Sequence, residues 1–98
     1  MLFVLYCRDA DGAAATRQAN RADHLAWAAE QPCIRMAGPM FAEDGETMIG
    51  SLFVVEFDDR EAVEQWRSAD PYVRAGLFDR VAVHPFRWAL GTGPAGTA

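Results

Sequence analysis

His24 and Asp70 are the two residues of this 98-residue chain whose side chains could together move a proton. A neutral imidazole accepts or donates a proton near pH 7, which suits general acid and base catalysis. A carboxylate that is hydrogen-bonded to the far nitrogen of an imidazole fixes its tautomer and raises its basicity. If the fold brings the two side chains together, they predict an acid–base site.

The surroundings of His24 depend on which face of its predicted helix packs on the rest of the protein. On a helical wheel the histidine lies between Leu25 and Trp27, the two largest apolar side chains of the segment. Nearly opposite runs a stripe of small residues, formed by Ala15, Ala19, Ala22, Ala26 and Ala29. If that stripe faced the core, His24 would be an ordinary surface histidine. The larger apolar area of Leu25 and Trp27 favours the arrangement that places His24 at the edge of the core.

Asp70 also has a purely structural interpretation. An aspartate at the N-cap followed by Pro71 at the first helical position is a common way to begin a short helix, and Gly76 is a suitable end for it. Such a cap occupies one carboxylate oxygen. The other oxygen would be free to bind an imidazole or a substrate hydroxyl, so the structural and the functional role are compatible.

Four further residues are candidate substrate contacts: Gly38, Pro39, Ser51 and Tyr72. Gly38 and Pro39 most simply mark a β-bulge, while Ser51 and Tyr72 could be ordinary strand and core residues. Each could also line a pocket, because glycine lets a ligand approach the backbone and a hydroxyl group can donate a hydrogen bond.

No other constellation in the sequence indicates chemistry. It contains no nucleophile elbow, no phosphate-binding glycine loop, and no cluster of His and acidic residues at metal-ligand spacing. Cys7 and Cys33 form no C-x-x-C pair and are interpreted as small buried thiols, and His84, which precedes a proline, is interpreted as structural. We therefore expect neither a metal nor a cofactor.

The chain that must position these residues alternates between strand and helix patterns. Four apolar, β-forming segments are predicted to be strands: residues 2–8, 33–41, 48–57 and 78–90. Two segments rich in helix-forming residues are predicted to be helices: residues 13–31 and 58–69. The first strand is almost wholly apolar and is expected to be buried on both faces. Pro32 ends the first helix, Asp58 caps the second, and Pro85 indicates an edge or a bulge in the last strand.

The order β-α-β-β-α-β predicts the ferredoxin-like α+β fold, in which an antiparallel sheet carries the helices on one face. The other face would stay exposed in a monomer, so we expect a homodimer whose two sheets pack face to face as a dimeric α+β barrel. Residues 1–90 are predicted to form a single domain. Residues 91–98 contain only Gly, Thr, Ala and Pro and are predicted to be a flexible tail.

Charge and hydropathy argue against several classes of partner. Fourteen acidic against nine basic residues give a net charge of −5, which disfavours binding to nucleic acid and to anionic membranes. No apolar run approaches the roughly 20 residues that span a bilayer. The N-terminus lacks the basic start and the cleavage site of a signal peptide. We therefore expect a cytoplasmic protein that binds neither nucleic acid nor membrane.

The motifs collected along the chain resemble those of the YciI-like (YCII-related) family over about residues 1–88. They are His24-Leu25, Ala37-Gly38-Pro39-Met40, Gly50-Ser51, Ala69-Asp70-Pro71-Tyr72-Val73-Arg74-Ala75-Gly76 and Val83-His84-Pro85-Phe86. The resemblance implies a dimeric α+β barrel with an active site that pairs a helix histidine with the aspartate of an Asp-Pro motif, here His24 and Asp70. It also implies roles at the site for Gly38, Pro39 and Ser51. One class of members removes chloride from a chlorinated hydroxyquinol.

Residues and resemblance together favour a cofactor-independent enzyme of lyase or isomerase type, similar to a dehydrochlorinase or a muconolactone isomerase. In this hypothesis His24 shuttles a proton on a small cyclic or aromatic substrate while Asp70 orients it. A non-catalytic small-molecule binding module and a monooxygenase on the same fold are the alternatives. Arg8, Trp27 and Arg35 depart from the family pattern and could shape a substrate preference.

Overall fold

The computed structural model describes residues 1–92, which form a four-stranded sheet and three helices. The elements in chain order are β1 (Leu2–Asp9), α1 (Ala14–Ala29), β2 (Ile34–Phe41), β3 (Met48–Glu56), α2 (Arg60–Arg67), α3 (Pro71–Arg74) and β4 (Phe78–Phe86). The strands lie in the order β2-β3-β1-β4, and each neighbouring pair is antiparallel. This arrangement confirms the predicted ferredoxin-like α+β fold and adds the short helix α3.

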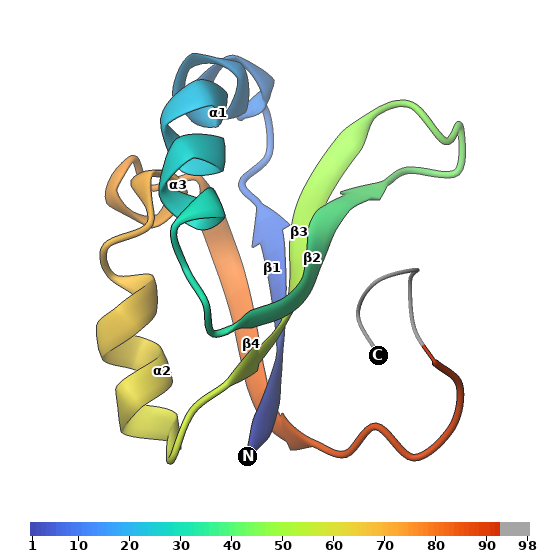
Figure 1. Ribbon diagram of the computed structural model, residues 1–98. Helices are drawn as coiled ribbons and strands as arrows, with labels where there is room; N and C mark the ends of the chain where they lie inside the picture. The colour runs from blue at the N-terminus through green and yellow to red at the C-terminus, as the bar shows by residue number, and fades with distance from the viewer. Residues whose placement is uncertain (93–98) are drawn as a thin grey trace.

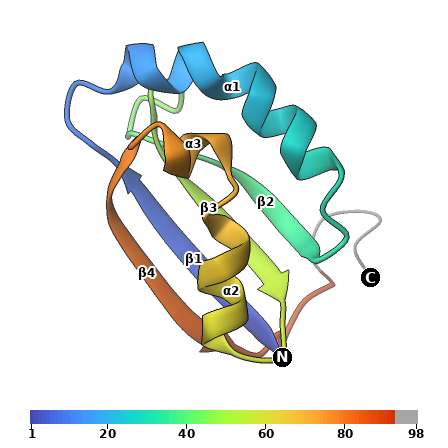
Figure 2. The ribbon, with the colours of Figure 1, turned by 90° about the vertical axis from the view of Figure 1, so that its left-hand side faces the viewer.

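All three helices lie on one side of the sheet (Figures 1 and 2). Successive side chains of a strand point to opposite faces, and in β1 this alternation sends Phe3, Leu5 and Cys7 toward the helices. These residues form the core together with Val63 of α2 and Val83 of β4. The core therefore occupies the layer between the sheet and the helices.

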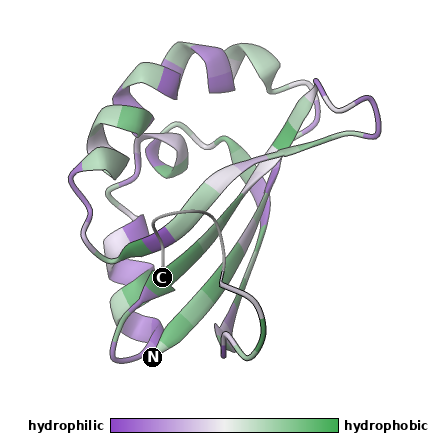
Figure 3. Ribbon diagram, turned by 45° about the vertical axis from the view of Figure 1, so that its right-hand side comes forward, coloured by the Kyte–Doolittle hydropathy of each residue, from purple (hydrophilic) through white to green (hydrophobic). Residues whose placement is uncertain are grey.

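The other side of the sheet carries none of the helices in residues 1–92, and we call it the open face. On β1 its apolar residues are Leu2, Val4 and Tyr6, which alternate with the core residues. Phe86, Val54 and Leu52 pair with these three across the strands and lie on the same face. The strands are predominantly hydrophobic, as Figure 3 shows. The expectation that the first strand is buried on both faces is wrong for the single chain, because only one face of β1 is covered by helices.

The two prolines within strands occupy the two edges of the sheet. Pro85 lies in β4 and Pro39 in β2, where the missing N–H interrupts the ladder least. The edge position expected for Pro85 is therefore confirmed. The predicted bulge at Gly38 and Pro39 is wrong, since Gly38 pairs with Leu52 and Pro39 with Ser51 in regular register. The register shifts lie to either side, between Ile34 and Met36 and between Met40 and Phe41.

Several element boundaries differ slightly from the predicted ones. The N-cap of α2 is Asp59 rather than Asp58, because Asp59 Oδ1 accepts a hydrogen bond from the Ala62 N–H at 2.8 Å. Strand β4 ends at Phe86, not at residue 90. Of the predicted flexible tail, residues 93–98 lie outside the described part of the chain. Within residues 1–92, no helix combines the length and the apolar character needed to cross a membrane.

Candidate active site

His24 and Asp70 meet where α1 crosses α3. His24 Nδ1 lies 2.7 Å from Asp70 Oδ1, and both side chains are buried. His24 lies in the second half of α1, and Asp70 is the N-cap of α3 with Pro71 as the first helical residue. Gly76, which follows the helix, has a φ of 70° that suits glycine. The structure therefore brings together the two residues that were predicted to form an acid–base pair.

Asp70 caps α3 and binds His24 with the same oxygen. Oδ1 accepts the N–H of Tyr72 at 2.9 Å and also bonds Nδ1 of His24. The prediction that each carboxylate oxygen would take one role is wrong, since one oxygen has lone pairs enough for both donors. Because the cap ties this oxygen to the backbone of α3, the helix itself aims the carboxylate at the imidazole.

The hydrogen bond to Asp70 leaves one ring nitrogen of His24 available. Because a carboxylate accepts hydrogen bonds, Nδ1 carries the proton and Nε2 of the neutral ring has a free lone pair. Within residues 1–92, every side-chain nitrogen or oxygen that is shielded from solvent has a hydrogen-bond partner. The one side-chain hydrogen bond of His24 is made by Nδ1. Nε2 is therefore accessible, and it can accept a proton from a bound molecule.

Helix α1 turns its polar side toward the interior. Its buried residues are Arg17 and His24, seven positions and therefore about two turns apart. The predicted burial of His24 is confirmed, but one of its reasons is wrong: Leu25 is 48% exposed. Trp27 supplies the expected apolar contact, with its ring centroid 5.1 Å from that of Trp66. The hydrogen bonds of Arg17 and His24 compensate for the cost of burying these polar side chains, so the face of α1 that carries them can pack against the rest of the protein.

The ring of Tyr72 lies against both buried polar residues of α1. It stacks on the imidazole of His24 with centroids 4.0 Å apart and an interplanar angle of 12°, and Arg17 Cζ lies 4.8 Å from its centroid. Burial raises the pKa of Tyr72, despite the opposing charges of Arg17 and Arg21. The phenol therefore stays protonated at neutral pH and can donate a hydrogen bond.

Arg17, Asp9 and Ser51 form a second polar cluster that the sequence analysis missed. Arg17 Nε and Nη2 donate to the two carboxylate oxygens of Asp9 at 2.7 and 2.8 Å, and Nη2 also donates to Ser51 Oγ at 2.9 Å. Burial opposes the charge of Arg17, but the hydrogen bonds and the charge of Asp9 raise its pKa overall. Because Ser51 Oγ accepts from Arg17, its own proton is free to bind a ligand. The available sequence signal was the two-turn spacing between Arg17 and His24.

A cavity of about 330 Å³ lies between α1 and strands β2 and β3. His24 lines it, together with all four predicted substrate contacts, Gly38, Pro39, Ser51 and Tyr72. Asp70 lies behind His24 and is not part of the wall. The volume is that of a small-molecule site. The arrangement thus combines an accessible base, two hydroxyl donors and room for a small ring.

The three residues that depart from the family pattern lie in different places. Trp27 is next to the site, with its ring centroid 6.3 Å from that of His24. Arg8 is exposed on β1, and Arg35 pairs with Glu56 at 3.3 Å, both away from the cavity wall. Within residues 1–92, no group of three His, Cys, Asp or Glu side chains is placed to hold a metal ion.

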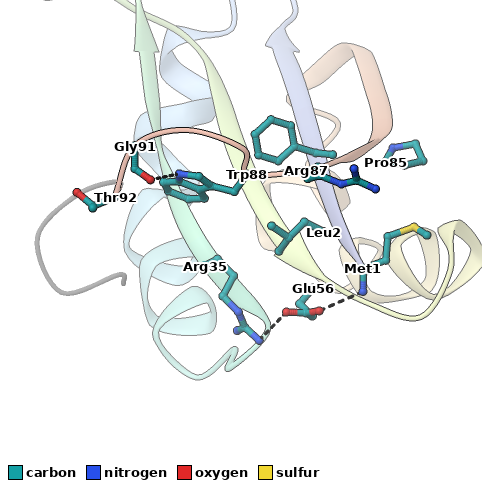
Figure 4. Close-up of a pocket in the computed structure, with 10 residues that line it drawn as sticks. Met1, Leu2, Arg35, Glu56, Pro85, Arg87, Trp88, Gly91 and Thr92 are labelled. Atoms are coloured by element: carbon teal, nitrogen blue, oxygen red, sulfur yellow. Dashed lines mark hydrogen bonds and ion pairs between the residues drawn. The ribbon is translucent and has the colours of Figure 1, made fainter.

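A larger hollow of about 1040 Å³ lies on the open face, beside the chain that follows β4 (Figure 4). Glu56 accepts hydrogen bonds from the amino group of Met1 at 3.0 Å and from Arg35 at 3.3 Å, and Trp88 Nε1 donates to the Gly91 carbonyl at 2.9 Å. These polar groups are paired with one another, and no histidine lines the hollow. The smaller cavity beside His24 is therefore the candidate active site.

Two solved structures show how far the architecture is shared. 5-Chloro-2-hydroxyhydroquinone dehydrochlorinase from Burkholderia phenoliruptrix, solved in complex with 2,5-dihydroxybenzoquinone, matches with a TM-score of 0.79 and 30% sequence identity, over 89% of this chain and 94% of that one. An antibiotic biosynthesis monooxygenase matches with a TM-score of 0.52 and 13% identity, over 89% of this chain and 99% of that one. The second likeness shows a common fold alone.

Sequence relatives cover nearly the same part of the chain. Protein YciI of Escherichia coli is 36% identical in an alignment of 95 positions that covers 89% of this chain and 97% of its own. An uncharacterized protein of Haemophilus influenzae is 32% identical over the same shares of the two chains. The model of the YCII-related domain matches residues 1–87. In agreement with the motifs of its sequence, the chain belongs to the YCII-related family.

Proposed function

We propose that this protein is an enzyme of lyase or isomerase type that moves a proton on a small cyclic or aromatic molecule. The observation that carries the proposal is the 2.7 Å hydrogen bond between His24 Nδ1 and Asp70 Oδ1, made beside a cavity of about 330 Å³ to which the histidine is exposed. The likeness to a dehydrochlorinase supports it, because that protein is named for a small hydroxylated ring.

In the proposed mechanism His24 Nε2 accepts a proton from a ring hydroxyl or an acidic ring carbon. The imidazolium that forms is stabilised by the Asp70 carboxylate at Nδ1. The hydroxyls of Ser51 and Tyr72 donate hydrogen bonds to substrate oxygens. In an isomerisation the imidazolium returns the proton to another atom, and in a dehydrochlorination the proton and chloride leave the ring as HCl. Both reactions are balanced without an external oxidant or reductant.

The first test uses 5-chloro-2-hydroxyhydroquinone, with release of chloride as the measurement. We expect His24→Ala to abolish turnover, because it removes the base. His84→Ala is the matched control, since His84 lies on the open face of β4 and outside the cavity wall. Light scattering of this variant checks that its assembly is that of the wild type. Wider screening would use other hydroxylated and halogenated rings. A His24→Ala variant that turns over an accepted substrate at the wild-type rate would refute the role given to His24.

A non-catalytic binding module and a monooxygenase predict other results in the same screen. The binding module would bind 2,5-dihydroxybenzoquinone and leave every ring compound unchanged after prolonged incubation. The monooxygenase would consume dioxygen, which an oxygen electrode detects. At 13% identity, the likeness to the monooxygenase supports a common fold and no common reaction. Of the three candidate functions, the hydrogen bond between His24 and Asp70 favours the acid–base reaction.

A second copy of the chain is the proposed cover of the open face. Tyr6 and Phe86 are large, apolar and exposed there, which is costly for a face that meets only water. Light scattering of the purified protein should give the mass of a dimer. Tyr6→Arg should give a monomer, while Gln18→Arg, on the exposed side of α1, should remain dimeric. A wild-type protein that is monomeric at all concentrations would refute this assembly.

A further inference from the structure

The cavity beside His24 is basic although the chain as a whole is acidic. Its wall contains Arg17, Arg21 and His24 but no Asp or Glu, in a protein of net charge −5. The two nearby carboxylates, those of Asp9 and Asp70, lie behind the wall and bind Arg17 and His24. A concave site with an excess of positive charge attracts anions and raises their local concentration.

Arg21 is the cation of this wall whose charge is not neutralised. It lies one turn after Arg17 and three residues before His24, on the same face of α1. Arg17 is bound to Asp9 and Ser51, whereas Arg21 makes no ion pair with any residue that the structure describes. Arg21 is also exposed, so its guanidinium can reach a ligand at the cavity mouth.

The remaining polar groups of the wall offer hydrogen-bond donors to a ligand oxygen. Ser51 Oγ is already an acceptor for Arg17, and the raised pKa of Tyr72 keeps its hydroxyl protonated. Nε2 of the neutral His24 ring is an acceptor that can take a proton from the ligand. Much of the rest of the wall is apolar, with Ile34 and Phe53 among its residues. These surroundings suit a flat ring that carries a charged oxygen and a proton within reach of His24.

The geometry points to an anionic ring compound as the ligand of this cavity, a carboxylate, phenolate or enolate whose charge is selected by Arg21. The inference rests on the proposed function for what happens to the ligand's proton. The preference for charge is itself a property of binding, and it can be measured without any turnover.

Benzoate and benzamide are a matched pair of probes, because they share a ring and differ in charge. Isothermal titration should show that benzoate binds about tenfold more tightly, as expected for a charge-assisted hydrogen bond. Arg21→Gln should lower the affinity for benzoate to that for benzamide and leave benzamide binding unchanged. Arg74→Gln is the control for the change in net charge, because Arg74 is exposed on α3, on the helix side of the sheet and outside the cavity wall. Added salt should weaken benzoate binding alone.

The outcomes separate this inference from the proposed function. If benzoate binds no more tightly than benzamide, or if neither binds, the anion preference is wrong. If Arg21→Gln retains the preference, Arg21 is not the residue that selects charge. If the preference depends on Arg21 but His24→Ala still turns over substrate, the inference stands and the proposed acid–base role of His24 falls.

Discussion

Replacing Arg17 by methionine should destabilise the fold by about 3–5 kcal/mol, the usual cost of removing one partner of a buried ion pair. Arg17 donates to both oxygens of Asp9, and the two side chains are only 7% and 9% exposed. After the substitution the Asp9 carboxylate would stay buried without its partner. Methionine keeps most of the aliphatic length of arginine, so little of the loss should come from packing.

Urea denaturation followed by tryptophan fluorescence measures this loss. A domain of this size has a free energy of unfolding of about 5–15 kcal/mol, so Arg17→Met should still fold. Its urea concentration at the midpoint of unfolding should be much lower than that of wild type. Adding Asp9→Asn removes the unpaired charge and should recover about 2 kcal/mol.

The matched control is Arg35→Met. Arg35 pairs with Glu56 on the surface, where the side chains are 43% and 47% exposed, so its midpoint should stay near that of wild type. If the urea midpoint of Arg17→Met lies as close to that of wild type as the midpoint of Arg35→Met does, then leaving Asp9 buried without its partner does not carry the predicted cost.

Further predictions concern Asp70, Gly50 and Cys7. Asp70→Asn keeps an oxygen for the cap and for His24 but removes the negative charge that stabilises the imidazolium. The kcat on an accepted substrate should therefore fall by about 10- to 1000-fold. The free energy of unfolding, measured by urea titration, should change by less than about 1 kcal/mol, because asparagine is also a good N-cap. Gly50→Ala should lower the melting temperature, because its Cβ would clash with the backbone of Cys7, whereas Gly38→Ala meets nothing within 4 Å and should melt like wild type. Burial raises the pKa of Cys7 from 9.0 to about 12, so native-state alkylation should label Cys33 first, as mass spectrometry can show. The pKa of Cys7 is higher in the folded than in the unfolded protein, so its contribution to stability is present below pH 9.0 and is lost as the pH rises toward 12. Over that pH range the free energy of unfolding should therefore fall more steeply for wild type than for Cys7→Ala.

Local signals in the sequence were sufficient for the elements and their order. Strand alternation, the stop at Pro32 and the Asp70-Pro71 helix start depend on residues that are neighbours in the chain, so they can be read without a structure. The errors occurred where local signals are degenerate. Asp58 and Asp59 both suit an N-cap, and a proline in an edge strand does not by itself distinguish a bulge from regular pairing.

His24 and Asp70 could also be identified as candidates before the fold was known, through their chemistry and the family motifs. The folded arrangement was needed to show that one oxygen of Asp70 binds both the Tyr72 N–H and the imidazole, and that Arg17 joins Asp9 to Ser51. Two of these contacts join residues far apart in the chain: His24 and Asp70 are 46 positions apart, and Arg17 and Ser51 are 34 positions apart. The buried face of α1 was likewise chosen by hydrogen-bond partners from other elements, not by apolar area along the helix. For that reason Arg17 was missed, and the apolar Leu25 was wrongly expected to be buried.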